Sequence, residues 1–228
     1  RHVHGPVFER QLFELALLPG DVGQPLARGQ RLGAVEHAGG DITGPLVVGR
    51  VLTMESEPQK NGETITALAA KSQPKMLWTE AFAQMGNSQV ESRFADRRTY
   101  FFEDKEIDRQ VHLGFDLASV QQAPVHASNA GLVVFADFLG IYGNCVIIDH
   151  GLGVQSLYAH LSSIGTKVGD SVAKGQELGR TGATGLAGGD HLHFTILLQG
   201  VPVNPVEWWD QHWLQDRVIR KIKEAGGR

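Results

Sequence analysis

The chain has 228 residues, 42% of them hydrophobic and 20% charged, which is enough for one large domain or two small ones with an ordinary core. Its formal net charge of −4 argues against nucleic-acid binding, which needs a basic stripe, and no apolar run approaches the roughly 18 residues of a membrane-spanning helix. The 28 glycines indicate many tight turns between short strands. Because the chain begins at Arg1 rather than at Met, we expect a processed form that has lost a signal peptide or membrane anchor.

Residues 1–94 are predicted to form a smaller β-rich domain. Alternating, strand-like stretches separated by turn residues cover residues 7–18, 45–54 and 63–70. Asn61-Gly62 lies between two of these stretches and is typical of a β-hairpin turn. His2 and His4 lie at the start of the chain and His37 is isolated beside Gly39-Gly40, so we interpret all three as surface residues.

Residues 95–210 are predicted to form an antiparallel β-sheet domain. Short apolar runs alternate with glycine-rich turns at residues 131–135, 144–149, 155–159 and 191–199. Connections this short favour antiparallel strands over alternating strands and helices. The helical pattern comes last and begins at Pro205, and residues 211–228 are expected to form a C-terminal helix that packs on the sheet domain. Three tryptophans are expected to hold this helix against the β core: Trp208, Trp209 and Trp213.

His191 and His193 are the first candidate pair of site residues. Residues i and i+2 of a strand point to the same face with Cα atoms about 6.5 Å apart, so both imidazoles address one cavity. The spacing leaves open whether both, one or neither binds a metal ion, because such pairs also occur on surfaces. Asp190 before them is interpreted as a turn residue, with support of a ligating histidine as the alternative.

His112 and Asp116 form a second candidate pair. On a straight strand they would lie about 13 Å apart, whereas on a helix or across a bend they would be neighbours. Gly114 between them provides the backbone freedom for a bend. A carboxylate in this apolar run needs a partner or a metal ion, and an ion pair with Arg109 is the structural alternative.

His160, at the end of a strand-like run, is the remaining candidate. The chain has no His-Glu-x-x-His motif, so it lacks the usual glutamate base of zinc proteases, and histidine is the suitable proton acceptor near neutral pH. A cysteine hydrolase built on Cys145, with His150 or His160 as base, is a rival hypothesis. Cys145 is the single cysteine and lies within an apolar strand, which favours a buried core residue.

Several other polar residues are interpreted as structural, namely His126, His150 and His212. Tyr142 and Tyr158 have two open interpretations: they line a cleft or they pack in the core.

Three segments follow one another over about 80 residues: His112-Leu113-Gly114-Phe115-Asp116, then Tyr158-Ala159-His160-Leu161, then Gly188-Gly189-Asp190-His191-Leu192-His193-Phe194. In this order they resemble peptidase family M23, the lysostaphin-type or LytM-type zinc metallopeptidases that cut peptidoglycan peptides. The strand-and-turn segments 143–151 and 168–176 resemble the family too, so the resemblance covers roughly residues 95–210. Thr195 stands where many relatives have an acidic residue.

By position, the resemblance implies that one zinc ion is bound by His112, Asp116 and His193. It implies that His160 and His191 flank the metal as general base and oxyanion stabiliser, without assigning either role. Two histidines, one aspartate and a water molecule make a four-coordinate open site. The implied function is a zinc-dependent endopeptidase that hydrolyses peptide cross-links or stem peptides of bacterial peptidoglycan.

An alternative function follows from the same resemblance. Some relatives have lost metal ligands and act as non-enzymatic modules that activate cell-wall amidases or scaffold division proteins. This chain retains all five site residues, which favours the enzyme. The resemblance implies a periplasmic or otherwise extracytoplasmic location in the bacterial cell envelope. Residues 1–94 are expected to be regulatory or to bind a protein partner.

Overall fold

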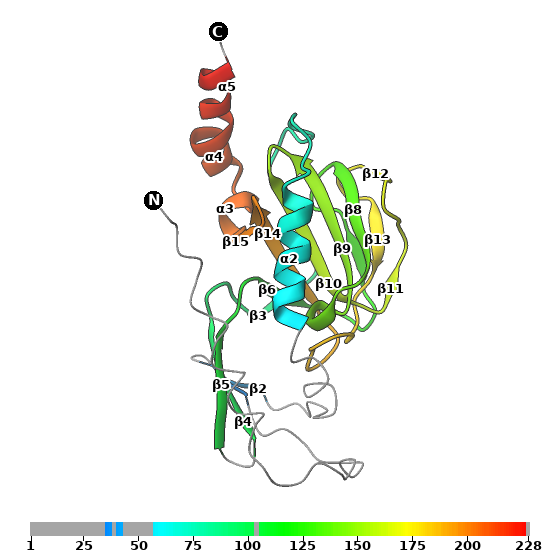
Figure 1. Cartoon of the computed structure of the whole chain (residues 1–228), viewed down its shortest axis with the longest axis vertical. Helices are drawn as coiled ribbons and strands as arrows, with labels where there is room; N and C mark the ends of the chain where they lie inside the picture. The colour runs from blue at the N-terminus through cyan, green and yellow to red at the C-terminus, as the bar shows by residue number, and fades with distance from the viewer. Residues whose placement is uncertain (1–34, 38–39, 43–56, 103–104, 227–228) are drawn as a thin grey trace.

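The computed structural model of the chain describes residues 35–37, 40–42, 57–102 and 105–226 (Figure 1). The strands expected at residues 7–18 and 45–54 lie outside the described residues, as do His2 and His4. No helix within the described ranges is long and apolar enough to cross a membrane.

The main sheet has eight strands, and its strand pairs are antiparallel. The spatial order is β12-β8-β9-β10-β14-β6-β3, and β15 pairs with β14 beside this path. The strands are β3 (Gln89–Ser92), β6 (Phe115–Ala118), β8 (Gly131–Phe138), β9 (Asn144–Gly151), β10 (Val154–Leu161), β12 (Ser171–Val172), β14 (Leu192–Leu198) and β15 (Val201–Val203). The expected mainly β, antiparallel fold with a C-terminal helix is confirmed.

Two smaller antiparallel sheets complete the described β structure. One contains β11 (Ser163–Ile164), β13 (Glu177–Arg180) and β7 (Pro124–His126). The other contains β2 (Gly40–Ile42), β1 (Val35–His37), β4 (Arg97–Phe102) and β5 (Lys105–Val111). Strand β3 lies upstream of the domain boundary expected at residue 94, yet it pairs with β6 in the main sheet. The division into domains 1–94, 95–210 and 211–228 stays a prediction.

The main sheet carries an apolar cluster on each face, because alternate residues of its strands point in opposite directions. On one face, Ile148 and Phe194 belong to a cluster that includes Trp78 and Phe82. On the other face, buried strand residues pack with Ile65 of helix α2: Cys145, Ile147, Leu157, Ala159 and Leu197. Figure 1 shows α2 lying across this second face.

Helix α2 (Glu57–Ala69) replaces the strand that the sequence pattern suggested at residues 63–70 and the hairpin turn at Asn61-Gly62. Both expectations were wrong. The buried positions, Asn61, Ile65 and Ala69, recur every four residues, which is the spacing of one face of a helix. The alternation that suggested a strand combined the buried Ile65 and Ala69 with the exposed Ala67.

Replacing Gly62 with alanine is expected to stabilise the protein by about 0.5–1 kcal/mol. Alanine loses less backbone entropy than glycine in a helix, and a Cβ atom at Gly62 would meet nothing within 4 Å. Urea denaturation measures the change in the free energy of unfolding. A type I′ hairpin turn would need a positive φ at this glycine, so destabilisation of the G62A variant would contradict the helix.

The C-terminal helical part is interrupted at Asp210. Helix α3 (Pro205–Trp209) begins after the N-cap Asn204, whose side chain accepts a hydrogen bond from the Val206 N–H. Asp210 ends α3 and caps α4 (Gln211–Leu214), which continues into π-helical η3 (Gln215–Ile219) and α5 (Arg220–Gly226). Trp208 is buried in the core, and Trp209 and Trp213 pack against it, as expected.

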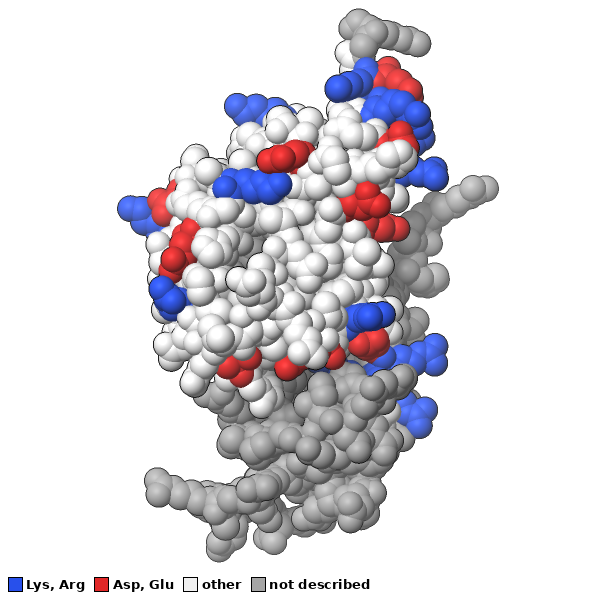
Figure 2. Space-filling model, turned by 180° about the vertical axis from the view of Figure 1, so that it is seen from behind, with Lys and Arg blue, Asp and Glu red and all other residues white. Residues whose placement is uncertain are grey.

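The face turned away from α2 carries few charges. In Figure 2 the described Lys, Arg, Asp and Glu side chains lie mainly around the margin of this face, and they form no continuous basic stripe on it.

Candidate metal centre

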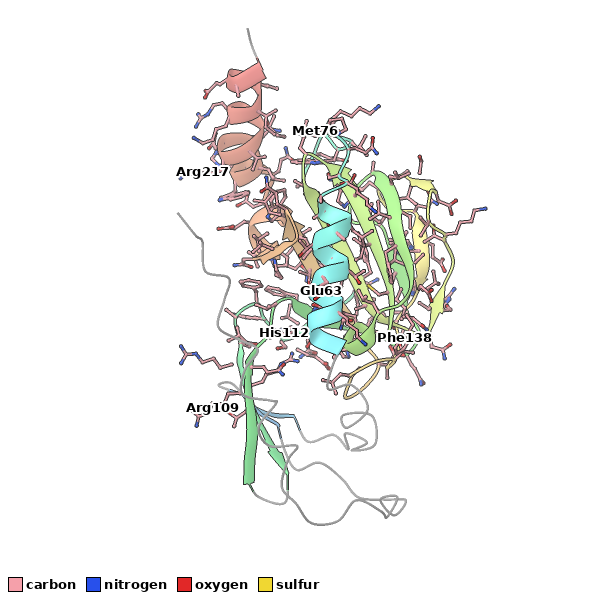
Figure 3. All side chains as sticks on the ribbon, viewed as in Figure 1. Glu63, Met76, Arg109, His112, Phe138 and Arg217 are labelled. Carbon is pink, nitrogen blue, oxygen red and sulfur yellow. The ribbon has the colours of Figure 1, made fainter. Side chains whose placement is uncertain are left out.

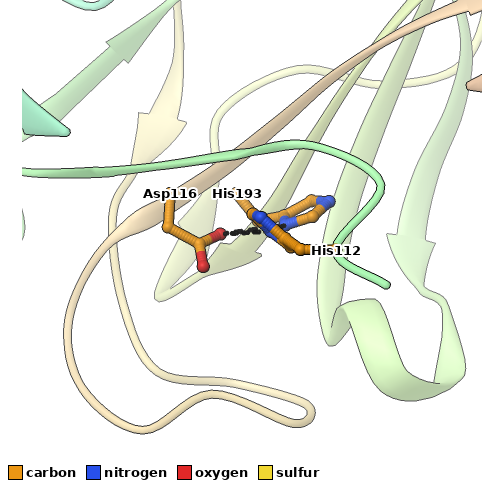
Figure 4. Close-up of side chains that lie close together, drawn as sticks. All are labelled: His112, Asp116 and His193. Atoms are coloured by element: carbon orange, nitrogen blue, oxygen red, sulfur yellow. Dashed lines mark hydrogen bonds and ion pairs between the residues drawn. The ribbon is translucent and has the colours of Figure 1, made fainter. Parts of the chain in front are cut away.

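Three of the predicted site residues converge in the fold: His112, Asp116 and His193 (Figure 4). All three are buried. Asp116 on β6 lies directly opposite His193 on β14 in the strand register. The Asp116 Oδ1 atom lies 3.0 Å from His112 Nε2 and 3.0 Å from His193 Nδ1, and these two nitrogens are themselves 3.0 Å apart.

The bend expected between His112 and Asp116 is present. Strand β5 ends at Val111 and β6 begins at Phe115, with Gly114 at the bend. Figure 3 shows His112 where the four-stranded sheet meets the main sheet. A Cβ atom on Gly114 would come within 2.6 Å of the His193 ring and of Thr195 Oγ1, so this position needs glycine for space.

The second ring nitrogen of each histidine is already hydrogen-bonded. His112 Nδ1 lies 2.9 Å from the carbonyl oxygen of Arg93, which can only accept, so Nδ1 carries the proton. The Thr195 hydroxyl donates to the Leu113 carbonyl at 3.0 Å and therefore accepts from His193 Nε2, also at 3.0 Å. In the neutral state, His112 Nε2 and His193 Nδ1 then present lone pairs.

Three acceptor atoms therefore face one another: two imidazole lone pairs and a carboxylate oxygen. Either an extra proton or a cation has to lie between them, because like partial charges repel at this distance. Ligand atoms bound at about 2.0–2.1 Å to one tetrahedral ion lie about 3.3 Å apart, close to the observed separations. Two imidazole nitrogens and one carboxylate oxygen are a donor set typical of zinc sites that keep an open position.

Asp116 remains ionised in this setting. Burial raises the pKa of its carboxyl. In the metal-free protein, hydrogen bonds that protonated His112, His191 and His193 donate outweigh burial and hold the pKa of Asp116 well below its usual value. Arg98 forms an ion pair with Asp116, with 2.6 Å between Nη2 and Oδ2, whereas Arg109 was the structural alternative proposed from the sequence.

His160 and His191 lie beside the three converging residues. The ring centroids of His160 and His191 are 4.9 Å apart, and those of His160 and His193 are 5.7 Å apart. His191 Nε2 lies 3.6 Å from Asp116 Oδ1. The five residues proposed from the sequence are thus brought to one place, on the face of the sheet that α2 also covers.

One loop holds both of these histidines. His160 Nδ1 donates to the carbonyl of Thr184 at 2.8 Å, and His191 Nδ1 donates to the carbonyl of Gly189 at 2.9 Å. Each ring is left with Nε2 as the nitrogen that can accept a proton. Burial, followed by repulsion from His191 and His193, lowers the pKa of His160 to about 3.

His160 reaches the site through a backbone irregularity. Regular alternation along β10 would turn its side chain away from the face that carries Ala159, the residue opposite His193. The β9–β10 register shifts between Tyr158 and Leu161, and His160 has a φ of 62°. This bulge redirects the imidazole toward His191 and His193.

The remaining candidates have mainly structural environments. Asp190 accepts hydrogen bonds from Thr181 Oγ1 and the Gln122 N–H, which agrees with a turn role. Tyr158 is buried and bonds to Ser128. Tyr142 lies at the site, with its ring centroid 5.6 Å from that of His193.

Cys145 is fully buried, and burial raises the pKa of its thiol. A thiol in that environment stays protonated near neutral pH and makes a poor nucleophile, which argues against the cysteine hydrolase hypothesis.

His150 is a buried structural histidine. Its Nδ1 donates to the carbonyl of Ala130 at 2.7 Å and its Nε2 accepts from Ser156 Oγ at 2.7 Å. Burial outweighs the favourable contacts and lowers the pKa of His150 from 6.5 to about 4.

This depressed pKa predicts a loss of stability in acid. The unfolded chain binds a proton at this histidine below pH 6.5, whereas the folded protein resists it down to about pH 4. Stability from His150 is therefore complete above pH 6.5 and is lost as the pH falls toward 4, by about 3 kcal/mol in total. Urea denaturation at pH 7 and pH 4 should show a loss that is about 3 kcal/mol smaller in His150→Gln than in the wild type, because His160 contributes to the loss in both. Equal losses in the two proteins would contradict the assignment.

Comparison with known proteins identifies the site-bearing segment. The sequence profile of peptidase family M23 matches residues 110–205, and this range contains all five site residues. We call residues 110–205 the M23 segment, after the family to which they are similar. The earlier resemblance is thereby confirmed for the M23 segment.

The M23 segment is similar to proteins of stated activity. The DD-carboxypeptidase/endopeptidase Mpg of Neisseria meningitidis serogroup B is 44% identical over 97 residues, which are 42% of this chain and 22% of that protein. The murein hydrolase activator EnvC of Escherichia coli is 37% identical over 95 residues, covering 42% of this chain and 23% of that protein. The aligned part thus spans about a fifth of the length of these curated relatives.

A solved structure is similar over more of the chain. The crystal structure of a Pseudomonas aeruginosa protein assigned to peptidase M23 has a TM-score of 0.56 and 26% sequence identity, and the match covers 83% of this chain and 78% of that one.

Sequence reasoning missed the contacts that support the ligands. Arg98 and Ser92, upstream of the M23 segment, contact Asp116 and His112. The available signal was the concentration of charged residues at positions 93–98, just before the predicted catalytic domain.

Proposed function

We propose that the protein is a zinc-dependent endopeptidase that hydrolyses peptide cross-links or stem peptides of bacterial peptidoglycan. One observation carries the proposal. His112 Nε2, Asp116 Oδ1 and His193 Nδ1 face one another as acceptors, each pair 3.0 Å apart, and a metal ion between them would satisfy all three at once. We assign these three residues as the ligands of one Zn²⁺ ion.

A bound zinc ion supplies Lewis acidity, which activates a water molecule and polarises the scissile carbonyl. The protein supplies the proton transfers. His160 and His191 each keep Nε2 available because Nδ1 donates to a loop carbonyl. One of them, in its neutral form, accepts the proton of the attacking water at Nε2. The other donates to the developing oxyanion from Nε2 when that nitrogen is also protonated, as it is in the imidazolium form.

The substrate class rests on the relatives. Mpg is named a carboxypeptidase and endopeptidase, and the similarity to it lies in the segment that holds the site. A peptidoglycan substrate places the protein outside the cytoplasm, in the bacterial cell envelope. Within this proposal, residues 1–94 regulate the site or bind a protein partner.

EnvC favours a second candidate function, a non-enzymatic module that activates cell-wall hydrolases. Such a role needs no metal ligands and no proton acceptor. The presence of both around one cluster supports the enzyme instead.

The test is digestion of defined peptidoglycan fragments by the purified, zinc-loaded chain, with products identified by mass spectrometry. The proposal predicts peptide-bond cleavage that a chelator stops and Zn²⁺ restores, while a thiol reagent has no effect. Absence of cleavage, together with stimulation of an added amidase, would support the activator instead.

A further inference from the structure

We propose that Arg98 and Ser92 are positioning residues of the metal site, so that a functional site requires chain upstream of the M23 segment. The inference rests on the proposed function, because it concerns the same site. Its supporting contacts come from a group of residues that we call the upstream clamp: Ser92, Arg93, Ala95, Asp96 and Arg98.

Arg98 occupies one oxygen of Asp116. Its Nη2 donates to Asp116 Oδ2 at 2.6 Å, while Oδ1 faces His112 and His193. The two carboxylate oxygens therefore have different partners: one faces the guanidinium and the other faces the converging histidines. An aspartate held in this way offers a cation a single oxygen, which keeps the coordination number low and leaves a position open for water.

Ser92 links this contact to the first histidine. Its hydroxyl oxygen accepts from Arg98 Nη2 at 3.0 Å and lies 3.2 Å from His112 Nδ1. Ser92 is only 1% exposed, so water does not compete for these bonds. A single buried hydroxyl therefore contacts the ligand His112 and the arginine that holds Asp116.

The clamp also fixes the backbone of His112. The Ala95 N–H donates to the His112 carbonyl, and the His112 N–H donates to the Asp96 carbonyl, both at 2.8 Å. The Arg93 carbonyl accepts from His112 Nδ1 and so selects its tautomer. The Arg93 N–H in turn donates to the Asp96 carboxylate at 2.6 Å.

The closing experiment compares variants of the 228-residue chain. Arg98→Gln removes the charged donor, and Arg97→Gln, on the exposed neighbour in the same strand, is the matched control. Zn²⁺ affinity is measured by competition with a chromophoric chelator, and the coordination is followed by the visible spectrum of the Co²⁺-substituted protein. Thermal unfolding of the metal-free variants reports folding.

We expect Arg98→Gln to weaken Zn²⁺ binding by about 10- to 100-fold, the usual effect of losing a residue that supports a ligand. The Co²⁺ absorption should fall because a released Asp116 can bind through both oxygens and raise the coordination number. Arg98→Lys should fall between the wild type and Arg98→Gln, and Arg97→Gln should match the wild type.

Equal Zn²⁺ affinity and equal Co²⁺ spectra in Arg98→Gln and Arg97→Gln would overturn the inference. If Arg98→Gln does not fold, Ser92→Ala decides: several-fold weaker Zn²⁺ binding supports the clamp, and wild-type affinity overturns it. These readouts do not depend on hydrolysis. A wild type that binds zinc tightly and cleaves nothing would refute the proposed function and leave the inference intact.

Discussion

Replacing His193 with alanine is expected to abolish stable zinc binding and to reduce peptidoglycan-peptide hydrolysis at least about 1000-fold. The substitution removes one of three proposed ligands. A catalytic metal ion lowers the activation barrier by several kcal/mol, and each 1.4 kcal/mol corresponds to a tenfold change in rate. Zinc per protein chain after dialysis and digestion of defined cross-linked fragments measure the two effects.

His126→Ala is the matched control, because it removes an exposed histidine on β7. The control should keep its zinc and its activity. A His193→Ala variant that retained both would refute the ligand assignment.

Gly114→Ala is expected to damage the site without removing any functional group. The added methyl would lie 2.6 Å from His193 Cε1 and Nε2 and from Thr195 Oγ1, all buried, so the imidazole must move. A displacement of about 1 Å at a reacting group typically costs about 100-fold in rate, and overpacking costs about 1–3 kcal/mol of stability. Hydrolysis rates, zinc affinity and urea denaturation report the three consequences.

Gly188→Ala provides the comparison, because it adds the same methyl to the loop before His191 where nothing lies within 4 Å. Its rate should stay near that of the wild type. Similar zinc affinity in the two variants would show that Gly114 does not set the position of His193.

The residues of the candidate site could be named from the sequence. The residues that contact and orient them could not. Ordered motifs identified His160, His191 and the three converging residues. The partner of Asp116 could not be chosen between Arg98 and Arg109, because the choice depends on how β3 pairs with β6 and β4 with β5. Such pairings are set by tertiary packing, and sequence distance alone does not reveal them.

Helix α2 shows a second limit. Short apolar-polar alternation fits a strand and part of a helix equally well, and the burial of Asn61 disguises the helical face in the sequence. The antiparallel sheet was easier to predict from the sequence, because glycine-rich turns separate its successive apolar runs. Gly114 shows a third limit. The bend at this residue could be predicted from the sequence, but the close approach of the His193 ring to Gly114 is visible only in the folded structure.

The left-handed backbone conformation of His160 has a consequence for the evolution of the protein as well as for its chemistry. A side chain with a Cβ atom in that conformation costs roughly 1–2 kcal/mol, a penalty that glycine avoids and asparagine reduces. Selection for folding alone would favour replacing His160, whereas under the proposed function selection for proton transfer would retain it. In a lineage that abandoned hydrolysis, we expect position 160 to drift early, with each such replacement making the inactive descendant more robust.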